Sequence, residues 1–337
     1  MPELPEVETV ARDLRPRLVG AEIVGARSTW ARTLRTHEPA SFRVAVSGRR
    51  VEAVGRRGKQ LVVDLSGGAA LTIHLKMTGQ LFVVPAAAPE DPYVRLVLEL
   101  ADGRELRFRD IRKFGRVGLY ERDRATGELT VGGAAGPFAA TGPEPLDTEF
   151  TLRDFRRRIR ARRGRLKPLL LDQSFLAGVG NIYADEALWA ARLHPLRSAP
   201  TLRPADERRL YEELRRVLSE AIVRRGSSVD DYTAPDGDGS MQERLQAYQR
   251  AGEPCPRCGR AIRRIVVGGR STHFCSWCQR LGRADRAAAV RILLGVETPS
   301  RPNDAGSHGS ERATRIRRAA ATRRAAARAS MASGSGT

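Results

Sequence analysis

The spacing of apolar side chains changes along the chain and predicts regions of different structure. Residues 5–19 predict one amphipathic helix, because their apolar side chains lie three or four positions apart. These side chains are Val7, Val10, Leu14 and Leu18. From about 20 to 121 the apolar residues form short β-rich runs instead, at residues 61–65, 71–75, 81–84 and 94–98. Several short strands with turns between them predict a β-sandwich or barrel.

The second half of the chain has the spacing of helices. Residues 122–150 are rich in Gly, Pro and Ala, and we predict that they link two domains. Helices are expected over Pro168–Gln173, Asn181–Arg192 and residues 204–225, followed by a polar loop at 226–240. After about residue 281 the structure signals end, apart from a short apolar patch at residues 290–296.

The chain is strongly basic, which predicts a polyanionic partner. Its 59 Lys and Arg outnumber 39 Asp and Glu, so that the formal net charge is +20. Nucleic acid is the commonest polyanion that such a charge recruits. Residues 301–337, mostly Ala, Arg, Ser and Gly, cannot bury a core and are expected to be disordered. No apolar run of about 18 residues and no apolar N-terminal stretch is present, so neither a membrane span nor a signal peptide is expected.

Four cysteines form two CxxC pairs separated by 16 residues, which predicts one structural zinc ion. The ligands would be Cys255, Cys258, Cys275 and Cys278. Four thiolates leave no position for a catalytic water, and His273 is not expected to be a fifth ligand. Strands at Ile262–Val267 and Ser271–Phe274, joined at two glycines, would place Arg270 at the hairpin tip, away from the metal.

These patterns together predict an α+β protein with several domains. An N-terminal β-sandwich with an N-terminal helix precedes a helical domain and a zinc ribbon. The predicted boundaries are 1–121 for the sandwich, 122–150 for the linker, 151–250 for the helical domain, 251–280 for the zinc ribbon and 281–337 for a basic, mostly disordered tail.

The first residues suggest a reactive amine. Removal of Met1 is expected because Pro2 is small, and it would leave Pro2 with a free secondary amine. An α-amino group has a pKa of about 8, against about 10.4 for Lys, so much more of it is free base at neutral pH. Such an amine can attack a sugar C1′ and form a Schiff base, with Glu3 and Glu6 as proton carriers. The alternative is that Met-Pro-Glu only opens a helix.

A second stretch indicates a close backbone approach. Gly178 and Gly180 allow tight turns, and Asn181 is expected to cap the helix that follows, whose N-terminus would be an anion site. A dinucleotide site is disfavoured because the third Gly and a surrounding βαβ unit are absent. The basic stretch from Phe155 to Arg165, which includes Arg162, would neutralise phosphates.

The N-terminal sequence PELPEVET resembles the start of the bacterial formamidopyrimidine-DNA glycosylases, the Fpg branch of the Fpg/Nei family. The segment from Gln173 to Glu186 resembles the helix–two-turn–helix of that family and is the most specific match. The resemblance covers roughly residues 2–280, and the family does not normally carry the tail.

The resemblance implies roles for individual residues. Pro2 would be the nucleophile and Glu3 the acid/base; Lys59 would take part in β-elimination and phosphate contact, and Arg270 in phosphate contact and δ-elimination. Met77 would fill the gap left by the extruded nucleotide, Phe114 would stack between base pairs, and Arg112 would donate to the orphaned base. Lys167 and Asn181 would hold phosphates. Without the resemblance, a core Met77 and a buried Phe114 would be the favoured interpretations.

Four departures from the family pattern bear on DNA contacts. Tyr93 stands where many relatives have a DNA-contacting His, Lys76 replaces a small residue, and Lys113 replaces an Arg. Residues 240–242 replace a Gly-aromatic-Phe pattern, and the loop 226–240 aligns with the lid that closes over the flipped base in the Fpg branch.

The predicted function is therefore a bifunctional DNA glycosylase/AP lyase that removes oxidised purines, 8-oxoguanine and formamidopyrimidines, from double-stranded DNA. A monomer in the bacterial cytoplasm, associated with the nucleoid, is expected. Two alternatives stay open: a Nei-type glycosylase for oxidised pyrimidines, and a non-enzymatic binder of damaged DNA.

Overall fold

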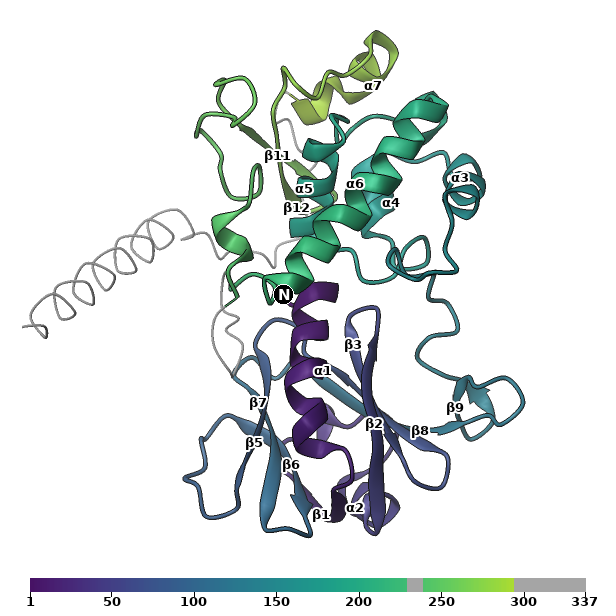
Figure 1. Cartoon of the computed structure of the whole chain (residues 1–337), viewed down its shortest axis with the longest axis vertical. Helices are drawn as coiled ribbons and strands as arrows, with labels where there is room; N and C mark the ends of the chain where they lie inside the picture. The colour runs from purple at the N-terminus through teal and green to yellow at the C-terminus, as the bar shows by residue number, and fades with distance from the viewer. Residues whose placement is uncertain (229–238, 294–337) are drawn as a thin grey trace, which may run out of the picture. The chain divides into compact units, whose positions relative to one another are not determined.

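The computed structural model describes residues 1–228 and 239–293, and its first element is the predicted N-terminal helix (Figure 1). This helix, α1, runs from Leu4 to Leu18. Val7, Val10 and Leu14 are buried on one face, as their spacing predicts. Pro5 lies in the first turn, where its missing N–H removes no intrahelical hydrogen bond.

Ten strands among the described residues form one antiparallel ladder in the order β10-β9-β8-β4-β3-β2-β1-β6-β7-β5. Their bounds are β1 Glu22–Ser28, β2 Arg49–Arg57, β3 Gln60–Leu65, β4 Ala69–His74, β5 Gly79–Pro85, β6 Val94–Leu100, β7 Arg104–Asp110, β8 Arg116–Arg122, β9 Leu129–Val131 and β10 Ala134–Ala135. A helix, α2 Pro39–Val46, and a 3-10 turn, Ala31–Thr33, lie between β1 and β2.

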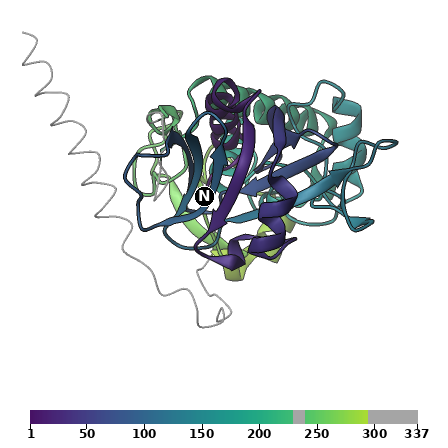
Figure 2. The same ribbon diagram turned by 90° about the horizontal axis from the view of Figure 1, so that it is seen from below.

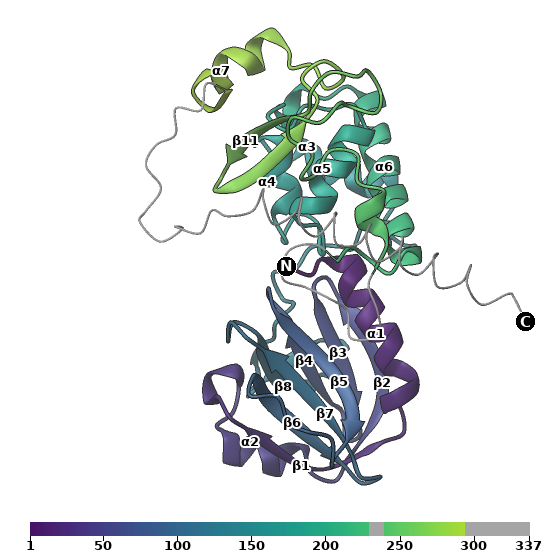
Figure 3. The same cartoon turned by 90° about the vertical axis from the view of Figure 1, so that its left-hand side faces the viewer.

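The ladder folds into two layers, which confirms the predicted β-sandwich (Figure 3). β1 and β2 pair over only two positions, so this short pairing is the corner between the layers. Apolar side chains from both layers, such as Leu71 and Phe108, share one core with α1. α1 lies against β2, as the views in Figure 1 and Figure 2 agree.

The second half of the described chain is helical and has its own core. Its helices are α3 Leu152–Arg160, α4 Leu166–Leu171, α5 Asn181–Ala190 and α6 Pro204–Val223, with 3-10 turns at Ala199–Thr201 and Met241–Glu243. Phe155, Tyr183 and Leu214 are buried in this second core. α4 begins at Leu166, two residues before the predicted start at Pro168. Pro168 is tolerated inside the helix because a proline in the first turn has no intrahelical hydrogen bond to lose.

The predicted linker and tail contain structure that the sequence did not reveal. β9 and β10 form a small hairpin inside 122–150 and extend the sheet beyond β8. After residue 281 the chain forms a helix, α7 Arg283–Leu293, so the prediction of a mostly disordered segment from 281 is wrong at its start. Ala289 of α7 packs with Ile265 and Phe274, and the Ala-rich sequence favours a helix.

The zinc-ribbon hairpin consists of β11 Arg263–Val267 and β12 Arg270–Phe274, close to the predicted strands. Gly268 and Gly269 both have positive φ, which a two-residue turn of this kind requires. The predicted lid at 226–240 lies largely outside the described residues, and so does the tail at 301–337. None of the described helices combines the length and apolar character needed to cross a membrane.

Candidate active site

Glu3 is buried at the N-terminus of α5, far from it in sequence. Its carboxylate accepts hydrogen bonds from the backbone N–H of Gly180 at 2.8 Å, Ile182 at 2.9 Å and Tyr183 at 3.4 Å. These are N–H groups that a helix start leaves without intrahelical partners. The anion predicted for this helix end is therefore a side chain of the protein itself, and it stands next to Pro2.

The two glycines of the turn make this approach possible. A Cβ atom on Gly180 would lie 2.3 Å from the Glu3 carboxyl carbon, and one on Gly178 would lie 2.7 Å from the Leu4 side chain. Gly178 also has a φ of +91°, and its carbonyl accepts a hydrogen bond from the Leu4 N–H at 3.1 Å. The predicted close approach is confirmed, and the group that approaches is the N-terminus.

The predicted cap of α5 is wrong. Gly180, not Asn181, occupies the N-cap, and Asn181 is the first residue inside the helix. The Asn181 side-chain N–H₂ donates to the Ser271 carbonyl at 3.0 Å. Asn181 is displaced from capping because Glu3 already accepts the free N–H groups. Its phosphate contact stays a prediction, since Nδ2 carries a second hydrogen.

Glu6 extends the N-terminal carboxylate cluster. It accepts the Glu3 backbone N–H at 2.9 Å, the Ser227 backbone N–H at 2.8 Å and the Tyr183 hydroxyl. Burial and the neighbouring Glu6 raise the pKa of Tyr183 well above its ordinary value. Glu6 therefore joins α1, α5 and the start of the 226–240 segment.

Lys59 and Arg270 act electrostatically on the same site. Burial raises the pKa of the Glu3 carboxyl, and the Lys59 ammonium opposes this shift. Burial lowers the pKa of Lys59; the Glu3 carboxylate opposes that shift and the Arg270 guanidinium adds to it. Arg270 is exposed at the start of β12, after the hairpin turn as predicted. A raised pKa for the carboxyl and a lowered pKa for the amine are the directions of shift that acid–base chemistry uses.

The turn that carries Lys59 is held by a linker residue that sequence reasoning missed. Glu144 accepts the Gly58 backbone N–H at 2.6 Å and pairs with the Arg56 guanidinium at 2.5 Å. Arg56 also pairs with Glu8 of α1 at 2.9 Å. The turn is thus fixed to both the linker and α1 and is not a free solvated loop.

The three residues predicted to fill the DNA gap lie on two loops joined by a buried carboxylate. Asp110 accepts the Thr78 hydroxyl at 2.5 Å and the Gly115 N–H at 2.7 Å, so it ties the Met77 loop to the loop after β7. Phe114 is 45% exposed, which excludes the alternative that it is a core residue. The Arg112 guanidinium lies 5.0 Å from the Phe114 ring centroid, so cation and aromatic project together. Met77 is half-buried.

Tyr93 lies beside this pair of loops and is 40% exposed. Its carbonyl accepts the Asp110 N–H at 2.9 Å. The guanidinium groups of Arg95 and Arg109 lie over its ring at 5.7 and 5.3 Å from the centroid. The position can therefore present an aromatic ring to a ligand, whereas the Arg95 guanidinium is buried and that of Arg109 is paired with Asp91.

Lys167 is buried inside the protein, which contradicts its predicted phosphate contact. Its side chain has 0% exposure and its ammonium pairs with Asp185 of α5. The ammonium also donates to the Ser271 carbonyl at 3.1 Å. Asp185 in turn accepts the His273 backbone N–H at 2.9 Å. Lys167 therefore joins α4 and α5 to β12 and leaves no donor at the surface.

Part of the basic stretch is also used within the protein. Arg160 forms two hydrogen bonds of 2.8 Å with Glu207, and Arg158 donates to the Ser174 and Phe175 carbonyls. Arg162 is half-buried, with its guanidinium 3.9 Å from the Asp172 carboxylate. Phosphate contact by Arg162 stays a prediction, whereas Arg158 and Arg160 already have partners.

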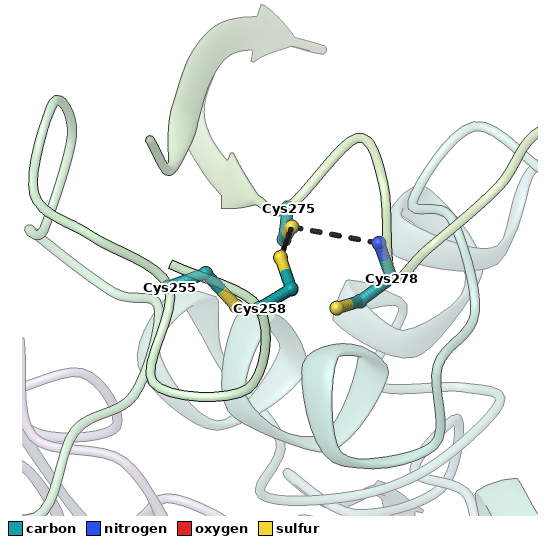
Figure 4. Close-up of side chains that lie close together, drawn as sticks. All are labelled: Cys255, Cys258, Cys275 and Cys278. Atoms are coloured by element: carbon teal, nitrogen blue, oxygen red, sulfur yellow. Dashed lines mark hydrogen bonds between the residues drawn. The ribbon is translucent and has the colours of Figure 1, made fainter. Parts of the chain in front are cut away.

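The four cysteines meet at the base of the hairpin, and their sulfur atoms all lie within 4.8 Å of one another (Figure 4). Cys258 Sγ and Cys275 Sγ are 3.5 Å apart. A tetrahedral zinc ion with Zn–S distances of about 2.3 Å requires sulfur–sulfur distances of just under about 4 Å. The four thiols therefore fit a single structural zinc ion. His273 faces Asp185 at 3.2 Å instead of joining the cluster.

Three family models match the chain in order. The model of the formamidopyrimidine-DNA glycosylase N-terminal domain matches residues 1–117. The model of the H2TH domain of the same enzymes matches residues 141–233, and that of the zinc finger found in FPG and IleRS matches residues 252–281.

Curated relatives match over almost their whole length. The formamidopyrimidine-DNA glycosylase of Herpetosiphon aurantiacus is 48% identical over 281 residues, which cover 83% of this chain and 100% of that protein. The protein of the same name from Chloroflexus aggregans is 50% identical over 283 residues, which cover 83% of this chain and 99% of that protein. The chain belongs to the formamidopyrimidine-DNA glycosylase family.

Solved structures of family members agree with the fold. The Lactococcus lactis Fpg protein in complex with DNA containing an abasic site superposes with a TM-score of 0.75 at 35% identity, and the match covers 83% of this chain and 100% of that one. A mutant of the same protein in complex with DNA containing Fapy-dG has a TM-score of 0.76 at 36% identity, with the same coverage. The family resemblance predicted from the sequence is thereby confirmed.

In this family member the buried Lys167–Asp185 pair should be a stability determinant. Asp185→Asn leaves a buried ammonium without its counter-charge, which should lower the free energy of unfolding by about 3 to 5 kcal/mol. Urea denaturation measures this loss. Adding Lys167→Met removes the uncompensated charge, so the double variant should recover much of the stability. Equal destabilisation of the single and double variants would contradict a charge effect.

Proposed function

We propose that this chain excises oxidised purines, formamidopyrimidines and 8-oxoguanine, from double-stranded DNA and then cleaves the strand at the abasic site. The chain is a base-excision-repair DNA glycosylase of the Fpg branch. One observation carries the proposal: the Glu3 carboxylate is buried beside Pro2, and the charges of Lys59 and Arg270 act on this site. The related Lactococcus lactis complexes, with Fapy-dG and with an abasic site, support the same substrates.

Pro2 and Glu3 would perform base removal. With Met1 removed, the Pro2 nitrogen uses its lone pair to form a bond to C1′ while the C1′–N bond breaks and its electrons leave with the base. The departing base takes a proton and the attacking nitrogen loses its own; the C1′–O4′ bond then breaks to give an iminium ion, and O4′ takes a proton. Glu3 suits this proton transfer because burial raises its pKa.

Lys59 and Arg270 would serve the two eliminations. Loss of a C2′ proton breaks the C3′–O bond, and loss of a C4′ proton then breaks the C5′–O bond, so each step releases a phosphate-bearing end. Burial lowers the pKa of Lys59, which favours the neutral amine that can accept a proton. Arg270 is exposed and keeps a positive charge for the phosphate that departs.

Met77, Arg112 and Phe114 would occupy the duplex at the position from which the damaged nucleotide flips. The exposed Phe114 ring can stack between bases, while Arg112 donates to the orphaned base. Because Asp110 accepts hydrogen bonds from Thr78 and Gly115, the two loops would keep their relative position as their side chains enter the duplex. We also infer that the protein acts as a monomer in the bacterial cytoplasm and associates with the nucleoid.

The test is borohydride trapping on a duplex that contains one abasic site. The reduced adduct should map by mass spectrometry to residue 2 of a chain that lacks Met1. Blocking the terminal amine should abolish trapping, whereas Lys59→Met should still form the adduct but eliminate slowly. An adduct on Lys59, or full lyase activity with a blocked amine, would refute the role of Pro2.

A further inference from the structure

A basic cavity of about 200 Å³ opens beside the active site on the outer face of β3, β4 and β8. Three of its lining side chains are cationic. The cavity is lined by Arg35, Gln60, His74, Lys76, Arg116 and Tyr120, among others. No carboxylate lines it. Its volume is large enough for a tetrahedral oxyanion, since one water takes up about 30 Å³ of liquid.

The three cations have no counter-ion within the described residues. Arg35, Lys76 and Arg116 form no ion pair there with any carboxylate, although most arginines along this sheet do. The Arg116 guanidinium donates to the Lys113 and Gly115 carbonyls, which fix its position without neutralising it. Like charges that converge on one cavity repel each other, and a bound anion would remove that repulsion.

Lys76 is the residue with the least favourable placement. Its φ of +55° lies in the left-handed region, which L side chains other than Asn and Asp rarely adopt. Burial lowers the pKa of Lys76, and the charges of Arg116 and Arg35 lower it further. A strained backbone and a repelled ammonium at one residue indicate a binding role for the side chain.

His74 adds a neutral donor. Its Nδ1 accepts the Lys76 backbone N–H at 3.1 Å, so that a neutral imidazole carries its proton on Nε2. Burial lowers the pKa of His74 to about 3, with Lys76 and Lys59 as further causes, so the ring stays neutral. The cavity thus offers cations and hydrogen-bond donors, which is the chemistry of a phosphate site.

Three residues that line the cavity are close in sequence to residues of the active site. Gln60 follows Lys59, Lys76 precedes Met77, and Arg116 follows the loop that carries Phe114. The charge of Lys76 is also one of the causes that lower the pKa of Lys59, so the cavity lies near that active-site amine. We propose that the pocket formed by Arg35, Lys76 and Arg116 binds a phosphate group, and that its occupant is a backbone phosphodiester of the bound DNA. The assignment of the phosphate group to DNA rests on the proposed function.

The first arm of the test is the salt dependence of equilibrium binding to duplex DNA. Each phosphate neutralised contributes about 0.9 to the slope of log K against log salt. The double variant Arg35→Gln/Arg116→Gln should therefore flatten the slope by about 1 unit. Arg122→Gln is the matched control, because Arg122 lies on the same strand as Arg116 but is already paired with Asp64. Equal slopes for the double variant and wild type would overturn the proposal.

The second arm locates the phosphate and uses the wild-type protein. Duplexes with a single neutral methylphosphonate at successive positions are compared for binding. Wild type should lose affinity at one position where the double variant loses none. The DNA assignment would be overturned by two results together: inorganic phosphate competes for the pocket at constant ionic strength, and no methylphosphonate position in the DNA changes the affinity. Free phosphate would then be the ligand. Trapping of wild type on abasic DNA is scored separately, so that a failed pocket is distinguished from a failed glycosylase.

Discussion

Glu3→Gln should reduce excision of a damaged purine by roughly 10²- to 10⁴-fold, which is the usual contribution of a general acid or base. Glu3 is 2% exposed, and burial raises the pKa of its carboxyl, which favours the protonated form that a general acid needs. An amide of nearly the same shape cannot exchange that proton. The measurement is single-turnover excision from a duplex that contains a formamidopyrimidine.

The same substitution should also lower stability. Both Glu3 oxygens accept backbone N–H groups of α5, and a Gln side chain offers only one acceptor oxygen. One helix N–H then loses its acceptor, at a cost of about 1 to 3 kcal/mol. Glu52→Gln, on the exposed surface of β2, is the control for charge loss alone. If Glu3→Gln excised at the wild-type rate, Glu3 would be a helix cap and not a proton carrier.

The sequence predicted those features that depend on local spacing. The apolar period of α1, the β-rich run at residues 61–65 and the two glycines of the Gln173–Glu186 segment all led to the observed elements. The cysteine spacing predicted a cluster that the structure brings together. Each of these signals lies within one short segment of the chain, where spacing, periodicity and turn chemistry are informative.

The features that were missed depend on partners distant in sequence. Asn181 was expected to cap α5, but Glu3, from the other end of the chain, takes the free N–H groups. The resemblance implied that Lys167 contacts a phosphate, but the side chain is buried against Asp185, a partner that only the fold identifies. α7 was missed because its apolar contacts lie on the zinc hairpin.

Glu144 and Asp110 illustrate the same limit at functional positions. Neither was given a role from the sequence, yet Glu144 holds the turn of Lys59 and Asp110 joins the two loops predicted to enter DNA. A single carboxylate in a linker or at a strand end carries no pattern. Its role becomes visible only from the N–H and hydroxyl groups that converge on it.

Removal of the zinc ion should have the largest structural effect. The apolar core of the hairpin is small, with Ile265, Val267 and Phe274 as its strand residues. Structural zinc sites supply about 10 to 16 kcal/mol of binding free energy, which is folding free energy for such a ribbon. Cys258→Ser should therefore lose the metal and unfold residues 251–280, while the sandwich core, which contains no ribbon residue, stays folded.

Loss of the ribbon should abolish DNA binding and strand cleavage together. β12 carries Arg270, and its Ser271 carbonyl is held by Lys167 and Asn181 only while the hairpin is formed. Metal analysis, amide hydrogen exchange and cleavage of an abasic duplex measure the three consequences on one sample. Ser276→Ala is the matched control, since Ser276 is exposed between two of the ligands. A Cys258→Ser protein that lacks zinc but binds and cleaves normally would show that Arg270 needs no metal to reach the DNA. If the amides of the sandwich also lost their protection from hydrogen exchange, the sandwich and the zinc hairpin would unfold as one unit.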